Sequence, residues 1–257
     1  MAFIYAGNLI SNKPAVIQRF QTGAAVYVGQ PVIEDYSNLY GHVIPLAAAA
    51  AAPDTTYNIM GVCVGIVNDP LYSSTYQAEY NTYDTTKAAV VANAHKDASM
   101  IEVAISRPGD MYEVPIVKDT IGTALDVVTN TTESTTALTL TMAAGTDYQL
   151  GYATMYCRSG ANKGLSRVIT TCSTTAKDAT IAFPYTIAVN DTFVCAAIKL
   201  GRFMLTPDSL FMAIDGDVAT GGNYYNAWCH KMDLSTAGAE KAWISFHPFH
   251  CWYNTVP

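Results

Sequence analysis

The sequence has few charged residues for its length. Of its 257 residues, 14% are Asp, Glu, Lys or Arg, whereas about 25% is usual in soluble domains. A surface with so few ions is covered either by Thr, Ser, Asn and Tyr or by partner proteins, because stable assembly interfaces are poor in charge and rich in aromatic side chains. The chain has 17 Tyr. The composition alone leaves both interpretations open.

Positive charge is especially scarce. The net charge is −7, and the five arginines are scattered along the chain. Binding to DNA or RNA requires clustered Lys and Arg side chains that displace counterions from phosphates. We therefore expect no nucleic-acid partner.

Long apolar runs are also absent. The uncharged stretches are interrupted by Pro, Gly, Asn or Thr, and none approaches the roughly 20 apolar residues of a transmembrane helix. Residues 1–6 lack the basic and apolar regions of a signal peptide. We expect a protein without a membrane partner that stays in the cytoplasm where it is made. There the six cysteines are expected to be small buried hydrophobes rather than disulfides.

The pattern that is present predicts an all-β fold. Short runs rich in β-branched and aromatic residues alternate with Gly, Pro, Asn and Asp, which is typical of strands and turns. The predicted strands are 25–28, 59–67, 101–105, 111–117, 124–129, 137–142, 152–157, 166–172, 179–183, 192–198 and 241–246. Arg107-Pro108-Gly109-Asp110 predicts a turn between two of them. Helical patterns occur only at Thr86–Asn93 and Ser235–Ala242, and both are short.

Changes in composition divide the chain into three parts. Residues 1–117 form an N-terminal β module and residues 118–205 a second one that is rich in Thr. The second module has strands spaced as in a β-sandwich or small barrel, and its best-defined hairpin covers residues 152–172. Residues 206–257 are an aromatic C-terminal segment that is expected to pack back on a β module.

One group of residues has the chemistry of metal ligands. Cys229 and His230 precede His247, His250 and Cys251, and sulfur and imidazole ligands suit Zn²⁺. However, the two pairs are far apart, neither forms a Cys-x-x-Cys knuckle, and many aromatic residues surround them. An aromatic core or interface is the better interpretation, so we predict no metal and no cofactor.

No complete catalytic motif can be assembled from the residues. Asp215-Gly216-Asp217 has too few oxygen ligands for calcium and is interpreted as a turn. Ser245 and His247 are close in sequence, but there is no Gly-x-Ser-x-Gly turn that would position a nucleophile. Gly-rich phosphate loops are absent. The sequence therefore predicts no catalytic residues and a protein that is not an enzyme.

Four stretches resemble structural proteins of tailed bacteriophages. Residues 22–32, Thr-Gly-Ala-Ala-Val-Tyr-Val-Gly-Gln-Pro-Val, and residues 59–65, Ile-Met-Gly-Val-Cys-Val-Gly, resemble the opening strands of capsid decoration (cement) proteins. Residues 160–169 and 190–194 are similar to a hairpin of phage head and neck proteins. The resemblance implies that the N-terminal module is a small β-barrel or β-tulip.

The same resemblance implies a structural virion protein. Such a protein decorates and stabilises the capsid by bridging major capsid protein subunits, commonly as a homotrimer or another homo-oligomer. It is assembled in the host cytoplasm and lies on the capsid exterior, where many weak contacts add through multivalency. We expect extended edges near Met1–Val16 to contribute by strand addition, so that a chain without residues 1–16 would fold but not bind.

Three alternatives stay open. A head-fibre, neck or tail component could contact a host surface or glycan through the Thr-rich module. A β-fold hydrolase could use two carboxylates, although no pair stands out among the 21 acidic residues. The main shell subunit itself is disfavoured, because the sequence has no signal for a long helix.

Overall fold

The structure is a computed structural model in which every described element is a strand. The described residues are 3–10, 13–22, 26–34, 42–46, 59–66, 100–117, 124–131, 137–141, 153–169, 178–196, 198, 200–203, 214–215 and 227–246. Over these ranges the elements are β1 to β17, which confirms the all-β class. None of the described residues belongs to a helix able to cross a bilayer.

The chain forms two compact units. Unit 1 consists of residues 1–114, 206–213 and 243–257, and unit 2 consists of residues 115–205 and 214–242. The predicted boundary between residues 117 and 118 falls at the end of β7. Residues 206–257, expected to be one segment, contribute to both units.

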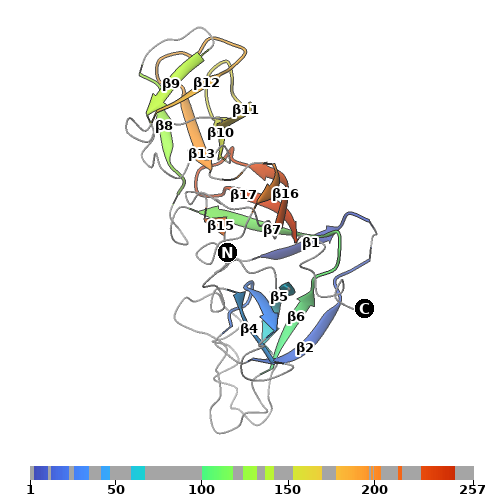
Figure 1. The fold of residues 1–257 in the computed structure, drawn as a ribbon. Coiled ribbons are helices and arrows are strands. Elements are labelled where there is room, and N and C mark those ends of the chain that lie inside the picture. The colour runs from blue at the N-terminus through green and yellow to red at the C-terminus, as the bar shows by residue number, and fades with distance from the viewer. Residues whose placement is uncertain are drawn as a thin grey trace. The chain divides into compact units, whose positions relative to one another are not determined.

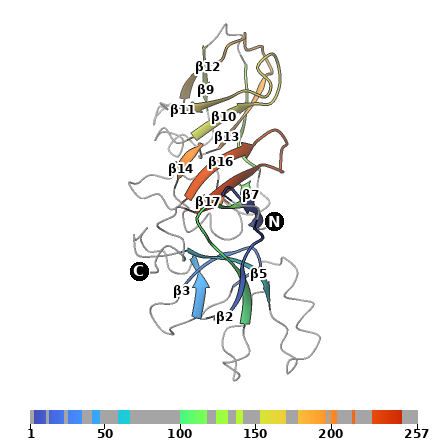
Figure 2. The ribbon, with the colours of Figure 1, turned by 90° about the vertical axis from the view of Figure 1, so that its right-hand side faces the viewer.

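Five strands of unit 1 close into a barrel. They are β2 (Ile17–Thr22), β3 (Pro31–Glu34), β4 (His42–Pro45), β5 (Ile59–Ile66) and β6 (Met100–Ile105). Their order around the barrel is β2-β4-β3-β5-β6, and β6 pairs with β2 to complete the ring. Figures 1 and 2 show these strands from two sides. Only β2 and β4 pair in parallel among these strands.

The barrel has an apolar interior made mostly of β-branched side chains. The buried cluster comprises Val26, Val32, Val43, Met60, Cys63, Ile101, Val103 and Ile105. Glycine allows two of the strands to approach closely, since a Cβ atom on Gly61 would collide with the backbone carbonyl of Ala104. Val and Ile fill the pleated inner surface well.

A second sheet contains the N-terminal strand. Its order is β1-β7-β17-β16-β14, with β15 beside β7. The strands are β1 (Ile4–Asn8), β7 (Asp110–Val117), β14 (Gly201–Phe203), β15 (Ile214–Asp215), β16 (Ala227–Asp233) and β17 (Lys241–Phe246). The division between the units passes through β7 and β17. Within unit 1, β1 pairs antiparallel with β7 and has a bulge between Tyr5 and Gly7.

Unit 2 contains two further sheets. The strands are β8 (Val127–Thr129), β9 (Ala137–Thr141), β10 (Ala153–Cys157), β11 (Ser166–Ile169), β12 (Asp178–Ala182) and β13 (Thr192–Ala196). The four-stranded sheet has the order β11-β10-β13-β8, and β9 pairs with β12.

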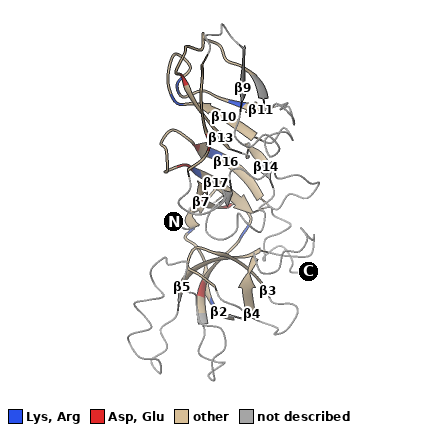
Figure 3. Cartoon of the chain, turned by 90° about the vertical axis from the view of Figure 1, so that its left-hand side faces the viewer, with Lys and Arg blue, Asp and Glu red and all other residues tan. Residues whose placement is uncertain are grey.

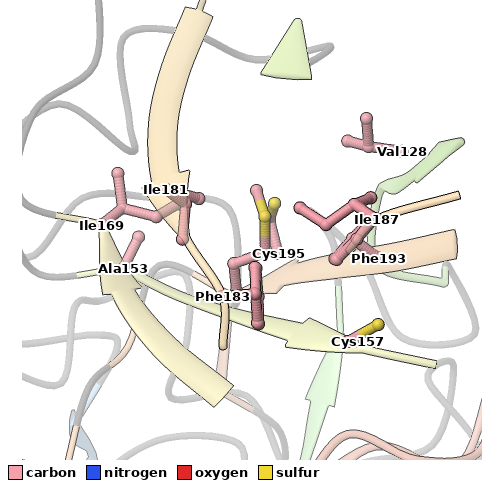
Figure 4. Packing of buried hydrophobic residues seen from close by; sticks show 10 residues of the cluster. Val128, Ala153, Cys157, Ile169, Ile181, Phe183, Ile187, Phe193 and Cys195 are labelled. Atoms are coloured by element: carbon pink, nitrogen blue, oxygen red, sulfur yellow. The ribbon is translucent and has the colours of Figure 1, made fainter. Parts of the chain in front are cut away.

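The apolar core of unit 2 centres on two phenylalanines. The rings of Phe183 and Phe193 are 5.4 Å apart. Their neighbours in the cluster include Ile181, Ile187 and Cys195. Figure 4 shows these side chains gathered between the strands.

Most predicted strands that fall on described residues are present. The runs at 59–67, 101–105, 111–117 and 241–246 correspond to β5, β6, β7 and β17. The runs from 124 to 198 correspond to β8 through β13. The hairpin predicted for residues 152–172 is confirmed as β10 and β11, which pair antiparallel.

Two predicted elements are wrong. Residues 235–242 are not a helix: the Asp233 side chain accepts hydrogen bonds from Ser235, and Gly238 at φ 75° continues a turn that leads into β17. Residues 26–28 are not a strand, because Gln30 N donates to the Tyr27 carbonyl and closes a turn. The helical pattern at Thr86–Asn93 lies outside the described residues.

Replacing Phe193 with Ala tests the core of unit 2. Phe193 is fully buried, so we expect the free energy of unfolding to fall by about 3–5 kcal/mol. Urea denaturation followed by circular dichroism measures it. Val127→Ala on β8 is the control, because Val127 is 50% exposed; similar losses for both variants would contradict the described core.

Candidate functional site

The residues considered as metal ligands do not form a site in the described part of the chain. Cys229 is buried and His230 half-buried, and they are consecutive on β16. Consecutive strand residues point to opposite faces, so this pair cannot approach one ion from the strand. His247, His250 and Cys251 lie outside the described residues. Across the described ranges, no three His, Cys, Asp or Glu side chains are grouped as a metal site requires.

The residues considered for catalysis are not brought together either. Ser245 is buried on β17, while His247 falls outside the described residues. Asp215 ends β15, and Gly216 and Asp217 are likewise outside. The described geometry therefore gives no support to a nucleophile and base at this place.

The described thiols are buried. Cys63, Cys157, Cys195 and Cys229 are free cysteines in the interior, which confirms the interpretation of these four as small hydrophobes. Burial raises the pKa of Cys63 and of Cys229 to about 12. Both thiols therefore stay protonated at neutral pH, and thiolate chemistry is suppressed.

The start of the chain exposes aliphatic side chains. We define the N-terminal segment as residues 3–10 and 13–17. Its exposed fractions are 59% for Ile4, 54% for Leu9, 77% for Ile10 and 54% for Ile17. Residues 3–10 carry no charged side chain. Figure 3 shows that most of the described ribbon is neither acidic nor basic.

An ion pair lies beside this segment at the turn between β6 and β7. Arg107 Nε donates to Asp110 Oδ2 at 2.9 Å, and Arg107 Nη2 donates to Oδ1 at 3.0 Å. The Asp110 side chain is 1% exposed. The predicted turn is confirmed, since Asp110 N donates to the Arg107 carbonyl. The hydrogen bonds to Asp110 raise the pKa of Arg107, so its guanidinium stays charged.

The ion pair holds the N-terminal segment in place. Asn8 Nδ2 donates to Asp110 Oδ1 at 2.7 Å, and Tyr5 Oη lies 3.2 Å from the same oxygen. Arg107 Nη2 also donates to the Pro14 carbonyl at 2.9 Å. Burial raises the pKa of Tyr5, and the negative charge of Asp110 raises it further. The segment is thus fixed through polar groups while its aliphatic side chains face outward.

Unit 2 has a second ordered surface element, which we call the Tyr185 loop and define as residues 183–191. Phe183, Ile187 and Asp191 are buried, and the other six residues are exposed. Buried residues thus alternate with triplets of exposed residues along the loop, and Tyr185 is 59% exposed.

Buried polar side chains lock the Tyr185 loop to its neighbours. Asn162 Nδ2 donates to the Tyr185 carbonyl at 2.9 Å, and Tyr185 N donates to Asn162 Oδ1 at 3.1 Å. Asn130 Nδ2 donates to the Ala188 carbonyl at 2.7 Å. Ala188 N donates to Asp191 Oδ2 at 2.9 Å. Sequence reasoning singled out the stretches around Asn162 and Asp191 but not this role.

Alkylation with iodoacetamide at pH 8 tests the buried thiols. We expect Cys63 and Cys229 to stay unmodified in the native protein, because their pKa of about 12 leaves almost no thiolate. Peptide mass spectrometry measures labelling, with protein unfolded in guanidinium chloride as the control. Equal labelling rates in both states would show that these thiols are accessible.

Asp110→Ala tests the ion pair. The change leaves Arg107 without its carboxylate, and losing one partner of a buried pair costs about 3–5 kcal/mol of unfolding free energy. We also expect faster hydrogen exchange at Leu9 N and Ile105 N, which donate to Gly109 and Val16. Native-state exchange monitored by NMR measures both effects.

Arg19→Ala is the matched control for that experiment. The Arg19 and Glu102 side chains form an ion pair but are 61% and 35% exposed, and such pairs contribute at most about 1 kcal/mol. If Asp110→Ala costs no more than Arg19→Ala, the anchoring role is wrong.

Comparison with protein families, curated proteins and solved structures gave no match.

Proposed function

We propose that this chain is a structural virion protein that decorates and stabilises a bacteriophage capsid by bridging major capsid protein subunits. The observation that carries the proposal is the N-terminal segment, which is ordered and yet exposes four aliphatic side chains. The segment is the surface that would bind the shell lattice.

Burial of the segment against a partner is favourable. Covering an aliphatic side chain contributes about 1.5–3 kcal/mol. Because residues 3–10 carry no charge, covering them would not remove ions from water, which is the main penalty at charged interfaces. Several such side chains in one short segment are enough for a specific, if modest, contact.

Ordering before binding strengthens such a contact. A flexible tail loses conformational entropy when it binds, and that loss reduces affinity. Here Asn8 and Tyr5 already bond to Asp110, so part of the loss has occurred during folding. The segment can therefore bind without a large rearrangement.

Strand β1 and the barrel add further support. β1 is the outermost strand in the order of its sheet, and outer strands can accept a strand from another chain. The two stretches that resemble cement proteins also lie together: Pro31 pairs with Val62, and Gly29 N donates to the Cys63 carbonyl. This pairing is consistent with opening strands of one small barrel.

The proposed place of action is the capsid exterior, after assembly in the host cytoplasm. A homotrimer or another homo-oligomer would present several N-terminal segments at once. Simultaneous contacts then multiply a modest affinity without any new kind of contact.

The structure changes the experiment that the sequence suggested. Phe3 is 2% exposed, and β1 is paired with β7 along its length. Removing residues 1–16 would therefore expose buried groups and damage the fold. Point substitutions of outward side chains separate binding from folding.

Leu9→Asp together with Ile10→Asp tests the proposal. Placing two carboxylates at the interface should weaken binding to empty shells of the same virus at least about tenfold, equivalent to 1.4 kcal/mol. Co-sedimentation of purified chain with shells measures it. Val127→Asp in unit 2 is the control, because it adds a charge at a half-exposed valine.

The copy number of the chain in purified particles provides a second test of the proposal. A decoration protein is present in proportion to the shell subunits, whereas a neck or tail component is present as a single ring. Shell binding that the double substitution leaves unchanged, or a single ring of copies, would overturn the proposal.

A further inference from the structure

We infer that unit 2 carries a separate interaction surface for an acidic protein partner, formed by the Tyr185 loop and the β10–β11 hairpin beside it. The surface consists of Lys163, Arg167, Tyr185 and Val189. The inference does not depend on a capsid role.

Two contacts place basic side chains beside the Tyr185 loop. The Asn162 side chain exchanges two hydrogen bonds with the Tyr185 backbone, so the chain at Lys163, the next residue, runs close to the Tyr185 loop. Arg167 on β11 lies with its Cζ atom 5.7 Å from the ring centre of Phe183, which is the first residue of the Tyr185 loop. Lys163 and Arg167 are both exposed.

The local charge is opposite to that of the whole chain. The chain has a net charge of −7. Of the side chains described within 153–169 and 181–196, the only carboxylate is Asp191, which is 5% exposed and bonded to Ala188 N. The exposed charges of this surface are therefore positive. Figure 3 shows basic positions near β10 and β11.

The surface is also rigid. Arg158 Nε donates to the Leu234 carbonyl at 2.8 Å, and its guanidinium pairs with the buried Glu240. Ser159 Oγ accepts a hydrogen bond from Thr192 N at 2.8 Å. These contacts fix the hairpin that presents Lys163, so little order has to be gained on binding.

The composition of the surface favours a protein as the partner. An arginine fork binds carboxylates in two-point geometry, and tyrosine adds apolar area with little entropy loss. Val189 is 50% exposed. An acidic protein surface offers aliphatic side chains for Val189 as well as carboxylates, whereas an anionic glycan offers charges, hydroxyls and C–H faces but no aliphatic side chain.

A short peptide of repeating Glu-Leu-Glu-Gly is the probe. When the peptide is titrated into the full chain, the backbone amide NMR signals of residues 162–168 and 184–190 should shift. Fluorescence anisotropy should show binding that weakens with added NaCl. The matched peptide with Gln in place of Glu should bind at least about tenfold more weakly. A sulfated oligosaccharide serves as the anionic glycan arm.

Variants assign the binding to this surface. Lys163→Glu with Arg167→Glu should reduce peptide affinity at least about tenfold, and Lys163→Gln with Arg167→Gln should reduce it less. Lys231→Glu, at another exposed lysine of unit 2, is the control and should leave affinity unchanged. Circular dichroism verifies that each variant is folded.

The inference would be overturned if the NMR shifts fell outside the named residues, or if the Gln peptide bound as tightly as the Glu peptide. It would also be overturned if the double variants bound the Glu peptide as tightly as the unmodified chain. Tighter binding of the sulfated oligosaccharide at the same residues would likewise overturn it. None of these bears on shell binding by Leu9 and Ile10, so failure here is distinguishable from failure of the capsid proposal.

Discussion

The buried ion pair between Arg107 and Asp110 organises the start of the chain. Asp110 is almost inaccessible to water, and a buried carboxylate is costly unless it is paired and fully hydrogen-bonded. Here the guanidinium, the Asn8 amide and the Tyr5 hydroxyl all converge on it. Satisfying this one carboxylate fixes the turn after β6 and holds Tyr5 and Asn8 against it, while Arg107 holds the Pro14 carbonyl. The apolar side chains of that segment are left outside because the polar ones are already engaged.

Unit 2 solves a similar problem mainly with neutral groups. Asn130 and Asn162 supply amide donors to loop carbonyls, and Asp191 accepts from the backbone within its own loop. Amides carry smaller desolvation costs than ions. The two units thus share a principle: buried polar side chains fix loops, and the loops present uncharged or weakly charged surface outward.

Much of the fold was predictable because its strands are local patterns. The runs at 59–66, 101–105 and 192–196 combine β-branched residues with flanking turn residues, and the Arg107-Pro108-Gly109-Asp110 turn has a sequence signature. The helix predicted for 235–242 failed because Asp233 and Gly238 impose a turn that alanine content does not reveal. The candidate surfaces were less predictable. The contacts of Asp110 with Tyr5 and Asn8 join residues about a hundred positions apart in the sequence. Local sequence patterns do not predict contacts between residues so far apart.

Closure of the β2–β6 barrel has a consequence for crowding. Each of its strands has a hydrogen-bonding neighbour on both sides, although β2 and β4 share only the pairs Gln21–His42 and Thr22–Val43. Unprotected rows of backbone amides seed fibrils when chains are abundant. Closing the ring therefore leaves the Val- and Ile-rich strands β3, β5 and β6 paired within the chain, where they are less able to template one another.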